Sequence, residues 1–270
     1  PGTTLRFGAE DFLLASGPLH FQGTAEAPVR LQPQDGEVWL GVVVLDAEAP
    51  SFWKHVTVEK TDVVIRDGWL LTGAVTFYQS PVRISHGRFL GSRAEDALNI
   101  VRTHFELADC EFADTASDAF DGDFTTGVVE RCVFHNIADD GVDVSGSDVT
   151  VRDSRFYHVG DKAVSVGEAS RMLVEDIFVD TADFALASKD ASYLEAARVT
   201  ARNIQIAALA AYIKKPVYGP AWVTINGLDA GDTPPEQIAL VQIRCYVDLD
   251  GERIWGWEVD VDALYEKWRD

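Results

Sequence analysis

Residues 139–148, DDGVDVSGSD, combine a group of acidic side chains with the patterning of a β-strand. Four of the ten residues are aspartates, and Val142 and Val144 alternate with polar neighbours. Alternation with a period of two is typical of a strand that buries one face. The aspartates have three possible interpretations: a metal-binding loop, a catalytic group, or one unit of a larger pattern. Whether the segment recurs along the chain decides between them.

The segment is part of a repeat with a period of 22 residues. FADTASDAFDGDF begins at Phe112, FHNIADDGVDVSG at Phe134 and FYHVGDKAVSVGE at Phe156, and we expect Phe178 to continue the series. FLGSRAEDALNIV begins one repeat earlier, at Phe89. Three other columns keep the same spacing: Asp96, Asp118, Asp140 and Lys162; Asn99, Asp121, Asp143 and Ser165; and Leu107, Val129, Val151 and Leu173. Self-similarity at a fixed period of this length is the signature of a repeat architecture.

The repeat predicts an all-β fold, namely a right-handed parallel β-helix with coils of about 22 residues. Apolar residues alternate within each repeat, as in LNI, VDV and VSV, and the tight turns of Gly, Asp and Ser leave no room for crossover helices. Each coil stacks its apolar column on the next, so only the stack closes a hydrophobic core. Leucine-rich repeats are of similar length, but their leucine and asparagine signature is absent.

We expect one β-helix domain over residues 1–270. Residues 1–37 form N-terminal strands and a cap, residues 38–226 form the coils, and residues 227–270 form a terminal coil and a C-terminal cap. Among these, HVTVEKTDVVIRDG (55–68) is interpreted as part of the coils. VDVDALYEKWRD (259–270) is predicted to form a short helix that covers the open end of the stack and protects its strand edge.

Composition excludes several classes of function. The chain has 44 acidic against 23 basic residues and a net charge of −21, so it repels nucleic acid and anionic membrane surfaces. No run of 18 apolar residues could span a membrane. Three cysteines do not describe a disulfide scaffold. Because the sequence begins at Pro1, the absence of a leader says little about location.

Strand parity gives the aspartates of the opening segment a common direction. If Val142 and Val144 point inward, Asp143 and Ser145 point to solvent. Asp121 and Asp123 occupy the same two positions one coil earlier, and Asn99 precedes them by another coil. Neighbouring strands lie about 4.8 Å apart, so stacked carboxylates repel each other. A bound cation, a raised pKa or a nearby lysine would relieve this repulsion.

Four of the seven lysines in the chain follow these carboxylates, namely Lys162, Lys189, Lys214 and Lys215. Lys189 falls in the column of Asp123, Ser145 and Gly167, and the bare Gly167 leaves a gap beneath it. Tyr212 and Tyr218 lie at the lysine end of the face. On the predicted face, carboxylates therefore lie in the earlier coils and lysine amines in the later coils.

A purely structural interpretation covers other parts of the pattern. The column of Asp96, Asp118, Asp140 and Lys162 sits at a turn, where Asp is favoured on conformational grounds alone. Cys110 and Cys132 are 22 residues apart and are expected to stack as reduced fillers. The six histidines show no paired ligand spacing, and no phosphate-binding loop, dinucleotide fingerprint or nucleophilic triad is present.

Several segments carry a resemblance to known proteins. SDAFDGDF, DDGVDVSGSD, GDKAVSVGE, ASKD and AAYIKKPVYGPA resemble the β-helix region of bacterial surface or secreted proteins, of the kind associated with CotH-like kinase domains, over about residues 1–225. The architecture is more distantly similar to the pectin-lyase-like superfamily of polysaccharide lyases, uronate epimerases and polygalacturonase-type hydrolases. The Gly-His-Gly and Arg-Ile-Lys elements of the polygalacturonases are absent. The resemblance implies a carbohydrate-active protein that is secreted or held at the cell surface.

The leading functional hypothesis is cleavage of an acidic polysaccharide by β-elimination, and a uronate epimerase begins with the same step. Asp121, Asp123 and Asp143 would hold Ca²⁺, which prefers hard oxygen ligands and would neutralise the substrate carboxylate. Lys189 or Lys162, with a pKa lowered by burial, would remove the proton at C5, with Asp143 as a further catalytic group. The predicted substrate-binding set is Lys214, Lys215, Tyr212, Asn99 and Ser165.

Two alternatives remain open at this point. The first is an inverting glycoside hydrolase with two aspartates as acid and base, whose carboxyl groups lie about 6.5–9.5 Å apart. A diagonal pair such as Asp123 and Asp143 suits that separation better than the directly stacked Asp121 and Asp143. The second is a non-catalytic surface module that binds glycan or a partner protein on its long flat face.

Overall fold

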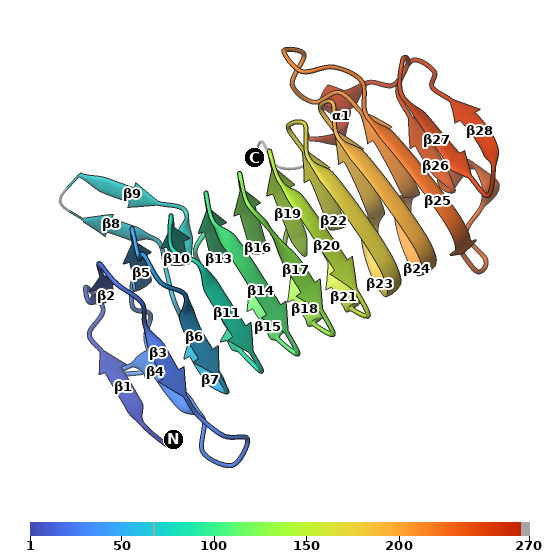
Figure 1. Ribbon diagram of the computed structural model, residues 1–270. Coiled ribbons are helices and arrows are strands. Elements are labelled where there is room, and N and C mark those ends of the chain that lie inside the picture. Colours follow the sequence, from blue (N-terminus) through green and yellow to red (C-terminus); the bar gives the residue numbers. More distant parts are fainter. Residues whose placement is uncertain (67, 266–270) are drawn as a thin grey trace.

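The computed structural model describes residues 1–66 and 68–265, which form an elongated stack of strands (Figure 1). The stack is an all-β, right-handed parallel β-helix of about 11 turns, as the repeat predicts. The coils wind around one continuous hydrophobic core, and each coil contributes strands to three faces.

Face A carries the acidic segment of the sequence. Its strands pair in parallel from one coil to the next. In order along the stack they are β2 (Phe12–Ala15), β5 (Gly41–Leu45), β10 (Gly73–Tyr78), β13 (Asp96–Val101), β16 (Asp118–Asp123), β19 (Val142–Ser145) and β22 (Lys162–Gly167), followed by the ends of the long strands β23 (Arg171–Lys189) and β24 (Tyr193–Tyr212) and by β26 (Ala239–Val241).

Faces B and C are built in the same way and complete each coil. Face B contains β3 (His20–Gln22), β6 (Ser51–Lys54), β11 (Val82–Ser85), β14 (His104–Ala108), β17 (Thr126–Glu130), β20 (Asp148–Arg152), the first parts of β23 and β24, β25 (Trp222–Asp229), β27 (Tyr246–Leu249) and β28 (Glu252–Trp255). Face C contains β1 (Thr4–Phe7), β4 (Val29–Pro33), β7 (Val56–Glu59), β12 (Arg88–Leu90), β15 (Glu111–Thr115), β18 (Val133–Ile137), β21 (Arg155–Val159), the middle parts of β23 and β24, and the end of β25.

The phenylalanine column forms a stacked ladder inside face C. The ring centroids of Phe89, Phe112, Phe134 and Phe156 lie 4.9, 4.9 and 4.6 Å apart, and their planes are nearly parallel. Offset stacking at this distance is a favourable geometry for aromatic pairs. Cys110 and Cys132 are buried free thiols in adjacent coils, as predicted.

The expectation that Phe178 and Leu173 continue their columns is wrong by one residue. Phe156 pairs with Val179, and Val151 pairs with Val174. The turn after β22 is one residue longer than its predecessors: both Glu168 and Ala169 have positive φ, whereas Gly146 is the one such residue in the preceding turn. The extra residue shifts the register and turns Phe178 outward.

Two other segments differ from the expected coils. Residues 62–66 and 68–71 leave the stack after β7 and include the antiparallel strands β8 (Val64–Arg66) and β9 (Trp69–Leu71). The N-terminal strands are themselves a coil, because β1, β2 and β3 pair in parallel with β4, β5 and β6.

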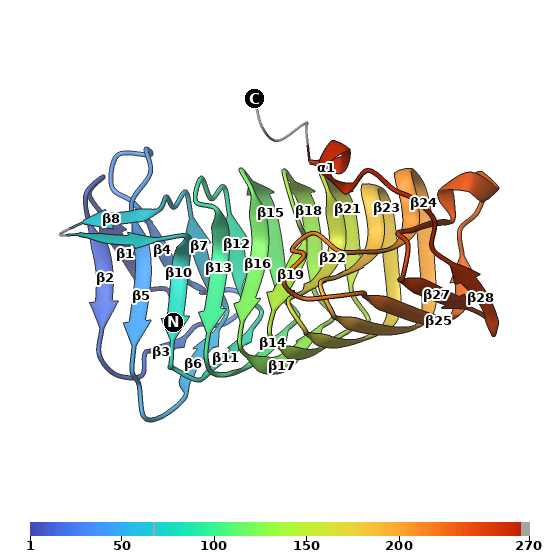
Figure 2. The ribbon, with the colours of Figure 1, turned by 90° about the horizontal axis from the view of Figure 1, so that it is seen from above.

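The C-terminal segment follows a path that the sequence did not predict. Within the described residues the expected helix is short: α1 (Val261–Leu264), with Asp260 as N-cap; residues 266–270 of the predicted helix lie outside the described part. The segment does not cover the end of the stack. It lies along the outside of face A, where Val261, Leu264 and Tyr265 pack against an apolar cluster that includes Phe184 (Figure 2). No helix in residues 1–66 and 68–265 is long and apolar enough to cross a membrane.

Candidate functional site

The predicted polar column on face A is confirmed as a ladder of directly paired residues. Asn99 pairs with Asp121, Asp121 with Asp143, and Asp143 with Ser165, while Val142 and Val144 are buried in the core. The same row becomes apolar beyond Ser165, where Ala187 continues it. The polar stretch is therefore confined to the coils in the middle of the face.

The outward direction of this column is confirmed, but the side chains are less exposed than expected. Asn99 and Ser165 are buried, and so are Tyr212 and the two lysines whose burial was predicted, Lys162 and Lys189. Three aspartates are half-buried, namely Asp121, Asp123 and Asp143. The predicted contact of Tyr212 with substrate is not available in this conformation, because the Tyr212 hydroxyl is hydrogen-bonded to that of Tyr265 at 2.6 Å and is covered by the C-terminal segment.

The carboxyl groups at the acidic end of the site have raised pKa values. The Asn99 side-chain amide donates to Asp121 at 2.8 Å and to Asp123 at 3.5 Å. Burial, reinforced by the charges of Asp96, Asp123 and Asp143, raises the pKa of Asp121 well above its ordinary range. Burial also raises the pKa of Asp123. A raised pKa favours the neutral form of a carboxyl group, which reduces the repulsion between stacked carboxylates.

The pKa of Asp143 is shifted in the opposite direction to those of Asp121 and Asp123, because a lysine lies beside it. Burial acts to raise the pKa of Asp143, but the Lys189 ammonium 3.6 Å from Oδ1 outweighs burial and lowers it. The gap predicted at Gly167 is occupied by the Lys189 side chain itself, since a Cβ atom at Gly167 would lie 3.4 Å from Lys189 Cε. Ser165 is also buried, and its hydroxyl group beside Asp143 contributes to the lowered pKa of that carboxyl.

The turn column beside this site has a clear structural role. Asp118 Oδ1 accepts the backbone N–H of Asp140 at 2.8 Å, and Asp140 Oδ1 accepts that of Lys162 at 2.8 Å. Lys162 Nζ contacts Asp140 at 3.3 Å and also contacts Asp161. Burial raises the pKa of Asp140 to about 7, and that of Asp118 well above its usual value.

The predicted lysine bases do not have lowered pKa values. Burial acts to lower the pKa of Lys162 and Lys189, but the carboxylates of Asp140 and Asp143 outweigh burial and raise both. Lys214 is the lysine of this group whose pKa is lowered, by burial and by the charges of Lys189 and Lys162. Its Nζ lies 4.2 Å from the ring centre of Tyr265.

The predicted calcium ligands do not gather into one site. Among the described residues, the groups of three carboxylates whose oxygen atoms lie within 4.8 Å of one another are Asp118, Asp140 and Asp143, and Asp139, Asp140 and Asp161. Ammonium groups already accompany both sets: Lys162 contacts Asp140 and Asp161, and Lys189 contacts Asp143. The residues present therefore do not fit a calcium ion, and no chemical step is derived through one.

Several site residues were missed from the sequence. Asp139 and Asp161 are 22 residues apart, so their spacing could have revealed them. Glu168 lies in the one-residue extension of the turn and accepts the Ser145 hydroxyl at 2.6 Å; it also contacts Lys215. Tyr265 reaches the lysines from more than fifty residues away, and no periodic signal announces it.

Comparisons with known proteins agree with this architecture. Residues 97–227 match the family model described as a right handed beta helix region. The fold is similar to that of WceF of Pantoea stewartii, described as a glycan biofilm modifying enzyme with a bacteriophage tailspike-like parallel beta-helix fold, with 10% sequence identity and a TM-score of 0.51 over 96% of this chain and 37% of that one. It is also similar to the enzymatically active domain of tailspike protein 2 of bacteriophage CBA120, with 11% identity and a TM-score of 0.47 over 91% of this chain and 43% of that one.

The family-model match over residues 97–227 agrees with the right-handed parallel β-helix fold of this chain. The chain spans less than half the length of the two structures, and at this identity the likeness concerns the fold. None of the curated proteins matches the sequence. The association with CotH-like kinase domains and the secreted or cell-surface location stay predictions.

Proposed function

We propose that the protein is a carbohydrate-active enzyme that hydrolyses a polysaccharide on face A, with Asp143 as the general base and Asp123 as the general acid. The observation that carries the proposal is that the pKa values of two neighbouring carboxyl groups are shifted in opposite directions. The pKa of Asp143 is lowered beside Lys189, whereas burial raises the pKa of Asp123. Pairs of carboxyl groups whose environments separate their pKa values are typical of acid and base assignments.

The register supports the pairing of these two residues. Asp121 lies directly opposite Asp143, and Asp123 lies opposite Ser145, so Asp123 is two positions along the neighbouring strand from the partner of Asp143. A diagonal pair leaves more room between the carboxyl groups than a direct one. An inverting hydrolase needs that room, because a water molecule must fit between the base and the sugar ring.

The rim of the site offers groups that suit a sugar chain. Ser145 and Glu168 are half-buried, and Lys215 is exposed. Lys214 is exposed as a residue, but its ammonium group lies over the Tyr265 ring, which accounts for the burial that lowers its pKa. These side chains supply hydroxyl, carboxylate and ammonium groups that hydrogen-bond to sugar hydroxyls. Asn99 and Ser165 lie deeper in the same ladder. The likeness in fold to an enzyme described as glycan-modifying is consistent with this substrate class.

Hydrolysis of a polysaccharide panel, followed by the release of reducing ends, tests the proposal. We expect Asp143→Asn and Asp123→Asn each to lower kcat by a factor on the order of 10²–10⁴, the usual contribution of a positioned acid or base. Asp148→Asn, an exposed aspartate on face B, is the matched control and retains activity. Proton NMR of the first product gives its anomeric configuration, which we expect to be inverted. Wild-type activity in Asp143→Asn refutes the assignment.

A β-eliminating lyase, or a uronate epimerase that shares its first step, is the second candidate. It is favoured by one observation, the lowered pKa of Lys214, since a lysine that loses its proton more readily is the better base. The base would then be Lys214, in place of Lys189 or Lys162. A lyase releases products that absorb ultraviolet light, and their appearance in wild type with loss in Lys214→Met would establish this candidate against the hydrolase.

A further inference from the structure

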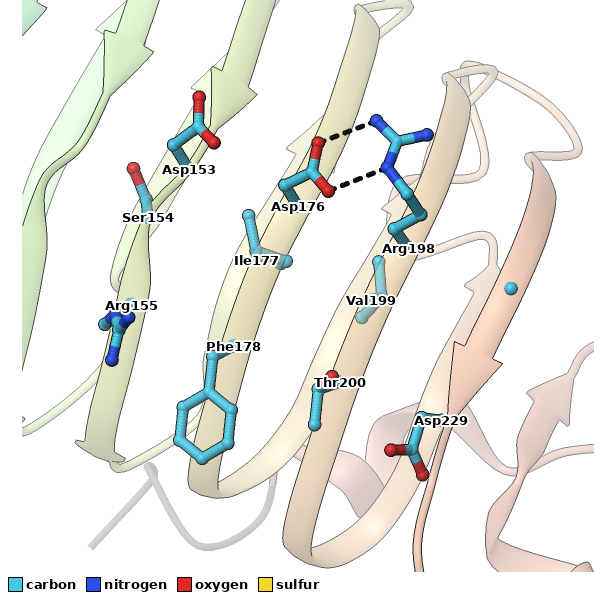
Figure 3. Close-up of a pocket in the computed structure, with 11 residues that line it drawn as sticks. Asp153, Ser154, Arg155, Asp176, Ile177, Phe178, Arg198, Val199, Thr200 and Asp229 are labelled. Carbon is cyan, nitrogen blue, oxygen red and sulfur yellow. Dashed lines mark hydrogen bonds and ion pairs between the residues drawn. The ribbon is translucent and has the colours of Figure 1, made fainter.

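A groove on face C, away from the acidic site, has the size and chemistry of a second ligand site. It has a volume of about 710 Å³ and runs across β21, β23, β24 and β25 (Figure 3). Ligand pockets for small molecules and chain segments usually measure about 300–1,000 Å³. The groove lies on the outer side of face C, whereas the phenylalanine ladder lies on the inner side of the same face. Its outward side chains include Arg155, Phe178 and Thr200, and the buried Ile177 and Val199 form part of its floor.

The groove owes an exposed aromatic ring to the longer turn after β22. The extra residue places Val179 in the inward phenylalanine column and leaves Phe178 pointing outward in the row of Arg155, Phe178 and Thr200. Phe178 is half-buried and faces the groove, with Tyr157 beside it at 5.7 Å between ring centres. An aromatic ring is thus moved from the core to the surface at this position.

Two ion pairs fix the charged side chains at the borders of the groove. Arg198 makes two hydrogen bonds of 2.7 Å to Asp176 in the adjacent coil. Arg202 makes a hydrogen bond of 2.6 Å to Asp229. Each pair joins neighbouring coils. Arg198 also contacts Glu175 at 3.3 Å, so that border carries one excess negative charge, whereas the border of Arg202 and Asp229 carries none.

Two charged side chains in the groove are left without protein partners. Asp153 and Arg155 make no side-chain hydrogen bond or ion pair within the described part of the chain. A carboxylate accepts, and a guanidinium donates, pairs of hydrogen bonds with planar geometry. Their opposite charges cancel, so the groove is close to neutral in a chain of net charge −21.

From these observations we infer that the groove on face C is a non-catalytic binding site for a neutral polysaccharide segment, in addition to the proposed reaction on face A. Adjacent sugar hydroxyls pair with Asp153 and Arg155, and the C–H face of a sugar ring packs on Phe178. The local neutrality disfavours an anionic chain, since no surplus of positive charge offsets the charge of the whole molecule. A polymer held here stays attached while other segments reach face A.

Affinity gel electrophoresis with neutral polysaccharides, such as β-glucan, xylan and glucomannan, tests the inference. We expect retardation of the wild type in at least one gel, and Phe178→Ala and Arg155→Ala each to weaken the affinity about tenfold. Leu173→Ala and Arg171→Ala are matched controls, because both residues are exposed on face B of the same strand and both variants retain wild-type affinity. Circular dichroism melting verifies that all four variants are folded.

Two results would overturn the inference: no retardation of the wild type in any neutral polysaccharide gel, or affinity in folded Phe178→Ala and Arg155→Ala equal to that of the wild type. The experiment is independent of the proposed hydrolysis. Asp143→Asn is expected to be retarded like wild type, since Asp143 lies on face A. Retardation without any hydrolytic activity therefore refutes the proposed function and leaves the groove assignment in place.

Discussion

Asp143 and Asp123 are the same side chain in two different electrostatic environments. Lys189 lies 3.6 Å from Asp143, whereas Asp123 is hydrogen-bonded to the neutral amide of Asn99. An ammonium neighbour stabilises the charged form of a carboxyl group, and burial without one favours the protonated form. The difference in pKa between the two residues therefore comes mainly from Lys189. This lysine can reach Asp143 because the residue between their coils in the same column is Gly167, which has no side chain.

The raised carboxyl pKa values predict that the folded state loses stability as the pH rises. Burial raises the pKa of Asp96 from 3.8 to about 7, and that of Asp140 likewise. Between these values the folded state holds protons that the unfolded state has released, so the free energy of unfolding falls with increasing pH. We expect Tm to be higher near pH 5 than near pH 7.5 by at least about 2 °C.

Calorimetry of wild type, Asp96→Asn and Asp148→Asn across this range checks the prediction. Asp96→Asn removes one of the titrating groups, so its Tm should depend less steeply on pH. Asp148→Asn changes an exposed aspartate and should follow the wild type. A Tm that is constant or rises between pH 5 and pH 7.5 contradicts the direction of these pKa shifts.

At the scale of the element, the turn between β22 and β23 decides which side chains reach the core. Its two residues with positive φ, Glu168 and Ala169, lengthen the coil by one residue. Because successive strand residues point to opposite faces, a shift of one residue exchanges the inward and outward sets. That single turn ends the phenylalanine ladder, places Phe178 on the surface and brings Glu168 to the rim of the acidic site.

The stacked phenylalanines are expected to contribute strongly to stability. Phe134 is fully buried between Phe112 and Phe156. Phe134→Ala removes both stacking contacts and leaves a cavity that neighbouring coils cannot fill, which typically costs about 3–5 kcal/mol. Urea denaturation measures the loss. Ile65→Ala, at an exposed position of the β8–β9 hairpin, is the control and should change the free energy of unfolding by less than about 0.5 kcal/mol.

At the scale of the whole molecule, the large negative charge attracts cations without defining a site for them. We expect calorimetric titration with Ca²⁺ to show no saturable binding on face A, because Lys162 and Lys189 already compensate Asp140 and Asp143. Saturable binding in wild type that disappears in Asp143→Asn contradicts this expectation. That result would establish the metal site and support metal-assisted elimination as the reaction.

The sequence predicts those features of the molecule that repeat. Phe112 and Phe134, or Asp121 and Asp143, reveal their stacking because 22 residues separate them in the chain. The shifted position of Phe178 was not predictable from that spacing, since a turn of one extra residue leaves the phenylalanine column apparently intact. Tyr265 reaches face A by a contact that occurs once, and a contact without repetition has no periodic signal.

The state of the site was less predictable than its location. Burial of Lys189 could be anticipated, and burial alone lowers a lysine pKa. The outcome depends on the competition between burial and the Asp143 carboxylate, which requires the distance between the two groups. The 22-residue repeat predicts where the charged side chains lie. Their pKa values depend on the three-dimensional contacts between them.

The orientation of the last strand of face B affects the end-to-end association of two molecules. β28 runs antiparallel to β27, whereas all the earlier neighbours on that face are parallel. A second molecule that approached this end with its own first coil would find the final strand reversed. A coil added beyond β28 would have to pair in a different orientation on face B than on the other two faces, so the reversal disfavours end-to-end growth into fibres.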